Sequence, residues 1–178
     1  MASAVLSHKW VMRLTFAALC LALLFLQLLP LETTPRRWAG PDLLVVLTVA
    51  WAVRQPKYTP PVLVALIFLL ADLLLLRPPG LMAAVMVIAV EVQHRRAQSL
   101  RSATFLTEWA IAAAVMIAVT LAYRLGLTVF LIERASLGLT LMQLIMNVIA
   151  YPFVVFLSSV LLGVRRTTVR DNGMGVAT

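Results

Sequence analysis

Long apolar runs separated by short polar connections dominate the chain. Uninterrupted runs of this length and hydrophobicity are typical of helices that cross a membrane. The pattern therefore predicts an all-α integral membrane protein in which residues 1–178 form one domain, a single bundle of six short transmembrane helices. The expected spans are 14–30, 39–55, 60–76, 80–93, 105–123 and 137–163.

The second to fourth runs are short for a membrane crossing. Thirteen helical residues reach only about 20 Å, whereas the hydrocarbon core is about 30 Å thick. Arg54 and Lys57 can lengthen the second run if their charged ends reach toward the membrane surface. Pro41, Pro60 and Pro61 stand at or near helix starts, where a missing N–H does no harm.

The two ends of the chain predict less regular structure. Residues 1–13 are expected to be a short tail before a first span that is retained as an anchor, because no small-residue cleavage site follows it. Arg124–Ala135 contains the apolar stretch Leu125–Ile132, which is too short to cross and predicts an interfacial segment. The last run contains Pro152, so it is either one kinked helix or two half-helices.

Composition agrees with this pattern. Of the 178 residues, 62% are hydrophobic and 12% are charged, about half the charged share of a soluble domain. The net charge of +8 comes from Arg and Lys in the connections, which favours a lipid bilayer over a nucleic acid as the partner of these charges. Cys20 is the only cysteine, so neither a disulfide framework nor a thiolate metal site is expected.

The basic residues also predict an orientation. With six spans, ten of the fifteen Arg and Lys residues fall on the side of the amino terminus. Cytoplasmic connections carry the excess of basic residues, so both termini are expected to be cytoplasmic. Trp51 and Trp109 then fall near the inner membrane boundary.

The helical hairpin over residues 40–80 carries two acids, Asp42 and Asp72, on the same outer side. A carboxylate within the membrane needs a partner, and Arg36, Arg37 and Arg77 are at the same level. The acids are either a polar site in the outer leaflet or a structural ion pair that locks the hairpin, with Asp42 capping a helix. Both alternatives stay open at this stage.

Two further helical faces are distinctive. Polar side chains follow one face of the last run, which predicts contacts with a neighbouring helix or a polar cavity. This stripe consists of Ser136, Thr140, Gln143, Asn147 and Tyr151. The fifth run presents small residues at every fourth position, which allow close helix packing within the bundle or with a partner. These are Ala110, Ala114, Ala118 and Ala122.

The remaining acids suggest helix stabilisation. Glu91 precedes Arg95 by four residues, the favourable order for a helical ion pair. Glu108 stands at the start of the fifth span, where the helix dipole favours an acid. His8 and His94 show no metal-ligand spacing, and no nucleophile motif is present. We therefore expect no enzyme, no metal and no cofactor.

The chain resembles the MreD family of bacterial rod-shape-determining membrane proteins. The resemblance is carried by Pro41-Asp42-Leu43-Leu44 leading to Trp51 and Pro56, and by Asp72-Leu73 followed by Gly80. It continues in Asn147-Val148, Tyr151-Pro152-Phe153 and Arg165-Arg166. It covers nearly the whole chain.

This resemblance implies a non-enzymatic scaffold or regulatory subunit of the rod (elongasome) complex in the bacterial inner membrane. Such a subunit binds MreC and, through it, links the MreB cytoskeleton to RodA and its paired transpeptidase, and so to lateral-wall peptidoglycan synthesis and cell shape. It also implies a fold similar to the substrate-binding subunit of energy-coupling-factor transporters.

The alternative function is a small-molecule or lipid-binding carrier, similar to a vitamin-capture transporter component. An intramembrane enzyme is a third class, which the lack of a visible nucleophile and base disfavours. Candidate residues for partner binding or for a structural lock are Pro41, Asp42, Trp51, Asp72, Arg77 and Gly80, and in the last helix Gln143, Asn147, Tyr151 and Pro152.

Overall fold

The computed structural model describes residues 2–29, 39–96, 104–131 and 136–162. Within these ranges the chain forms six α-helices and one short 3-10 helix, so the predicted all-α class is confirmed. The elements are α1 (Ala2–Leu28), α2 (Leu43–Arg54), η1 (Pro56–Tyr58), α3 (Pro61–Leu74), α4 (Leu81–Arg96), α5 (Phe105–Val129) and α6 (Leu137–Leu162).

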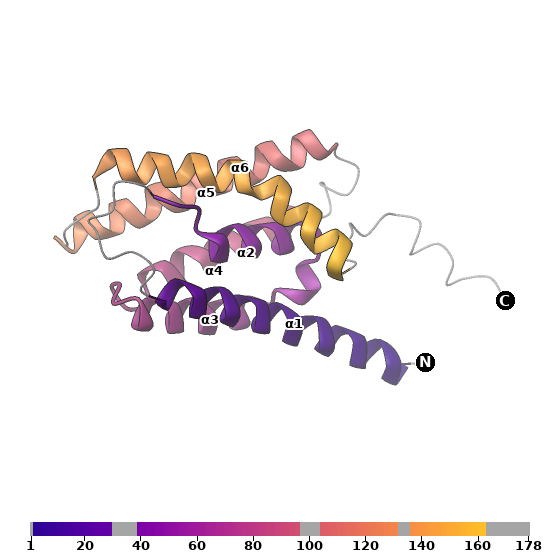
Figure 1. Ribbon diagram of the computed structural model, residues 1–178. Coiled ribbons are helices and arrows are strands. Elements are labelled where there is room, and N and C mark those ends of the chain that lie inside the picture. Colours follow the sequence, from indigo (N-terminus) through magenta and orange to yellow (C-terminus); the bar gives the residue numbers. More distant parts are fainter. Residues whose placement is uncertain (1, 30–38, 97–103, 132–135, 163–178) are drawn as a thin grey trace.

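Consecutive helices run in opposite directions. In the view of Figure 1, α1 and α3 lie on one side of the bundle and α5 and α6 on the other. The first turn of α1 and the last turn of α6 lie at the same end. We name the two ends of the bundle by α2: the Asp42 end, where α2, α4 and α6 begin, and the Arg54 end, where they finish.

Three helices are long and apolar enough to cross a membrane by themselves: α1 over His8–Leu28, α5, and α6 over Leu137–Leu161. Large apolar side chains also cover the outside of the bundle, among them Leu66, Ile149 and Phe156. Exposed apolar surface on this scale is unfavourable in water. The three candidate spans therefore indicate a multi-pass membrane protein, whereas α2 and α3 are shorter apolar helices.

Helix α2 is the centre of the bundle. It packs against α1, α4, α5 and α6, and every residue from Leu44 to Val53 is buried. A helix that is hydrophobic on all sides belongs in the interior. Its 12 residues span about 18 Å, and its neighbours rather than lipid surround it. The side chain of the basic residue that ends it, Arg54, was expected to reach toward the membrane surface, and it binds the buried acid Glu108.

Two predicted boundaries were wrong. Helix α1 begins at Ala2, so the predicted tail 1–13 is helical in its described part, which contains no Pro or Gly to break the helix. The stretch after Arg124 is not a separate interfacial segment, because α5 continues to Val129. Arg124 does not interrupt this helix, since its side chain turns into the bundle and donates a hydrogen bond to Thr140 Oγ1.

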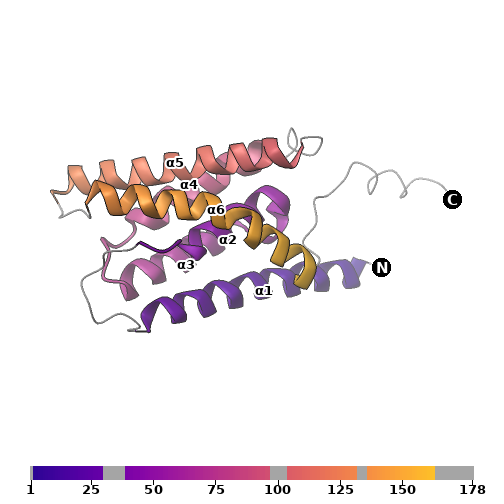
Figure 2. The same cartoon turned by 45° about the horizontal axis from the view of Figure 1, so that its top comes forward.

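The last predicted span is one helix, with Pro152 inside it. Figure 2 shows α6 bending along its length, so that its second half crosses α2 toward α1. A proline removes the hydrogen bond to the carbonyl four residues earlier and pushes that carbonyl away. Here that carbonyl belongs to Val148, and it accepts a hydrogen bond from Trp109 Nε1 at 3.0 Å. Trp109 of α5 thus stabilises the bend, a role that its expected place at the membrane boundary did not suggest.

Candidate functional site

Asp42 joins α1, α2 and α6 at the Asp42 end. Its Oδ1 accepts hydrogen bonds from Val45 N at 3.4 Å and from Gln27 Nε2 at 3.3 Å, so it caps α2. Its backbone N–H donates to Asn147 Oδ1 at 2.7 Å. Its Oδ2 lies 3.7 Å from Arg77 Nη2. The structural alternative for Asp42, a helix cap with an ion pair, is therefore realised.

Asp72 is fully buried in α3 and binds the start of α4. Its Oδ2 accepts hydrogen bonds from Met82 N at 3.2 Å and Ala83 N at 3.3 Å. Its Oδ1 has no hydrogen-bond partner in the described part of the chain. Of the two acids considered as partners of the nearby arginines, Asp42 lies against Arg77, while Asp72 caps α4 from the preceding helix.

The turn between α3 and α4 explains how Arg77 reaches Asp42. Leu76 ends α3 in the left-handed conformation, with φ 53°, and Arg77 N donates to Asp72 O at 2.9 Å. This is the hydrogen bond of a Schellman helix end, although a glycine usually occupies the left-handed position. Gly80, with φ 84°, then starts α4, and its conformation is one that few other residues adopt.

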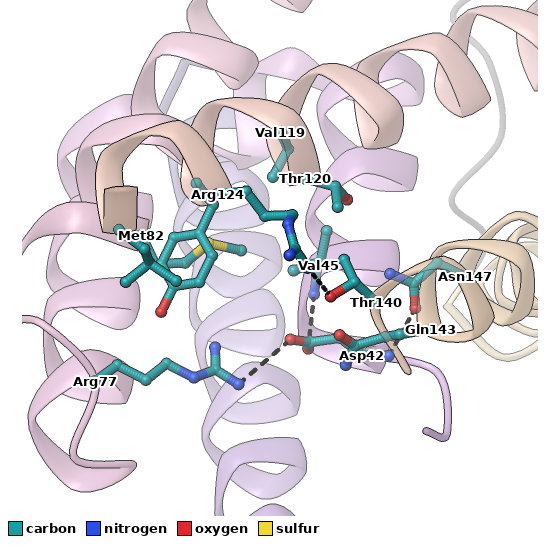
Figure 3. A pocket seen from close by; sticks show the side chains of 12 residues that line it. Asp42, Val45, Arg77, Met82, Val119, Thr120, Arg124, Thr140, Gln143 and Asn147 are labelled. Carbon is teal, nitrogen blue, oxygen red and sulfur yellow. Dashed lines mark hydrogen bonds and ion pairs between the residues drawn. The ribbon is translucent and has the colours of Figure 1, made fainter. Parts of the chain in front are cut away.

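A polar cavity of about 160 Å³ lies beside Asp42, between α2, α4, α5 and α6. Figure 3 shows Arg77 and Arg124 entering it from different parts of the chain, with their guanidinium ends turned toward Asp42 and Thr140. The lining residues are Asp42, Val45, Arg77, Met82, Val119, Thr120, Tyr123, Arg124, Leu127, Thr140, Gln143 and Asn147.

The polar stripe of α6 contributes to this cavity and to helix packing. Thr140, Gln143 and Asn147 line the cavity. One turn further on, the hydroxyl of Tyr151 donates a hydrogen bond to Glu108 Oε1 at 2.8 Å. The predicted inward face is confirmed from Thr140 onward, while Ser136 is exposed at the helix start. Both alternatives for the stripe, a cavity lining and an interhelical bond, occur on the same helix.

A buried ionic cluster at the Arg54 end was missed by the sequence interpretation. Arg54 Nε lies 2.8 Å from Glu108 Oε1, and Arg54 Nη2 donates to Glu108 Oε2 at 3.4 Å. The Glu108 side chain is 0% exposed, so it is held by an ion pair rather than by its helix dipole alone. The sequence signal that could have found it is the order of the helices, since α2 ends and α5 begins at the same end of an up-and-down bundle. The resulting cluster, Arg54, Glu108 and Tyr151, connects α2, α5 and α6.

Trp51 and Pro41, two of the candidate partner-binding residues, differ in exposure. Trp51 was expected near the membrane boundary but is fully buried. Its ring centroid lies 5.4 Å from that of Phe16, and its Nε1 donates to Ser158 Oγ at 3.2 Å. Its role is therefore to pack α1, α2 and α6. Pro41 is exposed immediately before Asp42.

The small-residue face of α5 points away from the bundle. Ala110, Ala114, Ala118 and Ala122 are all exposed. Ala118 and Ala122 line an apolar groove of about 200 Å³ between α5 and α4. Within the described structure the face therefore does not pack another helix of this chain. Of the two alternatives from the sequence, close packing inside the bundle is not seen for these four residues among the described helices.

The predicted ion pair of α4 is confirmed. Arg95 Nε lies 3.0 Å from Glu91 Oε1, and both side chains are exposed. Two further residues considered for the outer site, Arg36 and Arg37, lie outside the described residues. The described ion pairs thus divide into an exposed pair on α4, a buried cluster at the Arg54 end, and the pair beside the cavity at the Asp42 end.

Chemically, this geometry suits binding and assembly. Asp42, Asp72 and Glu108 each accept hydrogen bonds that hold a helix end or join helices. The cavity offers guanidinium, hydroxyl and amide groups toward a small polar ligand, and the alanine face offers a close-packing surface to another helix. Comparison of the chain with protein family models, curated proteins and solved structures finds no match.

Proposed function

We propose that the chain is a non-enzymatic scaffold subunit of the bacterial rod complex, similar to the MreD family. In this proposal it binds MreC in the inner membrane and, through it, connects MreB with RodA and the paired transpeptidase. All six helices lie within the membrane region, with both termini cytoplasmic and the Asp42 end outside. The central α2 then lies within the bilayer, surrounded by the longer helices.

The observation that carries this proposal is the outward direction of the alanine face of α5. Lipid tails are as apolar as leucine, so helices associate in membranes mainly through close packing and interhelical hydrogen bonds. Small residues repeated every four positions allow that close approach, and this chain supplies no helix to cover them among its described residues. A transmembrane helix of a partner protein is the natural occupant. The resemblance to the MreD family suggests MreC.

The buried acids support a structural rather than a catalytic role. Asp72 binds the amide groups that start α4, and Glu108 binds Arg54 and Tyr151. A general acid or base needs to reach a substrate proton. Glu108 and Asp72 are instead buried among the helices that they join.

Co-purification with MreC tests the proposal. Ala118→Leu and Ala114→Leu place bulky side chains on the α5 face and should lower MreC recovery several-fold at equal membrane levels. Ala18→Leu, at an exposed alanine of α1, is the matched control and should leave recovery unchanged. Equal recovery of MreC with all three variants would count against the proposal.

The second candidate function is a small-molecule or lipid-binding subunit. The observation that favours it is the polar cavity of about 160 Å³ at the Asp42 end. A ligand that co-purifies with the protein in mild detergent and is released by substitutions in the cavity lining would support this function. Retention of the same ligand after those substitutions would contradict it.

A further inference from the structure

The cavity at the Asp42 end has no role in the scaffold function, and its lining has a definite chemical character. Its apolar wall is formed by Val45, Met82 and Val119. On the polar side, Arg77 is turned toward Asp42, the single acidic residue of the lining, and Arg124 is turned toward Thr140 (Figure 3). Cationic groups thus outnumber anionic groups around the space, which favours an anion as the ligand.

The single acid is already engaged by the protein. Asp42 Oδ1 accepts hydrogen bonds from Val45 N and Gln27 Nε2, and Asp42 Oδ2 lies near Arg77. A guanidinium carries five N–H donors, so the ion pair with Asp42 leaves Arg77 with further donors. A cationic ligand would compete with bonds that hold α2, whereas an anion would use donors that these bonds leave available.

Two neutral polar groups of the lining lack a protein partner. Across the described residues, neither the hydroxyl of Tyr123 nor the side-chain amide of Gln143 makes a hydrogen bond with another residue. Both side chains are half-buried and line the cavity. Because no residue of the described structure occupies these donors, they are available to water or to a ligand in the cavity. A phenol and an amide can both donate to an oxyanion.

The size of the cavity selects among anions. A volume of about 160 Å³ corresponds to roughly five water molecules at about 30 Å³ each. Sites for drug-sized ligands start at about 300 Å³, so the cavity itself is better matched to a small anionic group than to a whole vitamin. A phosphate group presents more terminal oxygens than a carboxylate and carries more negative charge, so it can use two arginines and two neutral donors at once. Arginine forks also match its geometry.

We propose that this cavity binds a phosphate group, presented either by the headgroup of an anionic lipid or by a small soluble phosphate. Arg77 and Arg124 supply the positive charge, and Tyr123 and Gln143 donate neutral hydrogen bonds. The inference rests on the cavity of the second candidate function and is independent of MreC binding. Leu127 in the lining and the exposed Leu131 beyond it give an acyl chain an apolar surface next to the site.

The test uses the full-length protein in neutral detergent with two probes. Native mass spectrometry measures retention of phosphatidylglycerol against zwitterionic phosphatidylethanolamine, and titration calorimetry measures binding of inorganic phosphate. Tyr123→Phe and Gln143→Leu should each weaken binding of the effective probe about tenfold. Tyr58→Phe, at a half-buried tyrosine of the Arg54 end, should leave binding unchanged.

A lipid headgroup and a soluble phosphate are expected to give different results with these two probes. Selective retention of phosphatidylglycerol without calorimetric binding of phosphate identifies a lipid headgroup, and phosphate binding identifies a soluble ligand. The proposal is overturned if the wild-type protein binds neither probe selectively, or if Tyr123→Phe and Gln143→Leu bind as the wild type does. Thermal unfolding of each variant separates lost binding from lost folding, and MreC recovery on the same variants should stay at the wild-type level.

Discussion

The buried cluster of Arg54, Glu108 and Tyr151 allows a quantitative prediction about stability. Glu108→Leu removes the carboxylate from a side chain that is 0% exposed and leaves the guanidinium of Arg54, 12% exposed, without its acid. Removing one member of a buried ion pair costs about 3–5 kcal/mol, because the remaining charge stays in a poorly solvated place. We expect Glu108→Leu to lower the free energy of unfolding by that amount.

Two further variants separate the contributions within the cluster. Tyr151→Phe removes a hydrogen bond to a charged group, worth about 1.5–3 kcal/mol. The double variant Arg54→Leu with Glu108→Leu removes both charges and should recover much of the loss. Replacing a whole buried ion pair by apolar residues is often neutral or stabilising, by about 1–4 kcal/mol.

Reversible unfolding in mixed micelles, followed by tryptophan fluorescence, measures these free energies. The control is Glu91→Leu, which breaks an exposed pair and should change the stability by less than about 1 kcal/mol. The reasoning fails if Glu108→Leu costs no more than this control. It also fails if the double variant is less stable than Glu108→Leu alone, since the loss would then arise from packing rather than from an uncompensated charge.

Three other predictions use the same unfolding assay. Trp109→Phe should lower the free energy of unfolding by about 1–3 kcal/mol, because it leaves the Val148 carbonyl four residues before Pro152 without its donor. A loss below about 0.5 kcal/mol, the size expected for a surface substitution, would contradict this role. Asp72→Leu should lower the free energy of unfolding by about 1–3 kcal/mol, and Asp72→Asn should lower it clearly less. Of the two replacements, only asparagine keeps an acceptor for the first turn of α4. Equal losses would be inconsistent with a capping role. Leu131→Gly should stabilise the protein by up to about 1–2 kcal/mol, because the backbone φ of 53° at this position is unfavourable for leucine. A destabilised variant would mean that the exposed leucine side chain contributes more to stability than the backbone strain removes.

The helices themselves were largely predictable from the sequence. Apolar runs bounded by Pro41, by Pro60 and by Gly80 correspond to helices α2 to α4. The polar stripe of α6 also faced inward as predicted, because hydrogen-bonding groups in lipid seek a partner. These features depend on local periodicity and hydrophobicity, which a single sequence displays directly.

The pairing of charges was harder to predict because it depends on how the helices are rotated. The predicted topology places Arg77 on the same side of the bundle as Asp42 and Asp72. The left-handed turn at Leu76 then directs the Arg77 side chain to Asp42. Arg54 and Glu108 are separated by 54 residues, so their contact requires the packing of α2 against α5. The end of the bundle at which a residue lies can be predicted from the sequence, whereas the direction of its side chain cannot.

The wrong boundary at Arg124 has a physical cause. The fifth span was expected to end before Arg124, because the apolar stretch after it is too short to cross a membrane. The helix continues because the guanidinium turns inward to Thr140 and to the cavity, so that the charge does not face lipid. A polar residue inside an apolar run can therefore mark the inner face of a helix as well as its end.

The bond between Trp109 and the Val148 carbonyl has a mechanical consequence. The direction of the second half of α6 depends on a donor that belongs to α5 rather than on its own backbone ladder. The same helix, α5, carries the outward alanine face on its other side. A rotation of α5 about its axis would therefore move the indole relative to the proline and change the angle at which α6 crosses α2. One helix thus links an outer surface of the protein to the shape of its carboxyl-terminal arm.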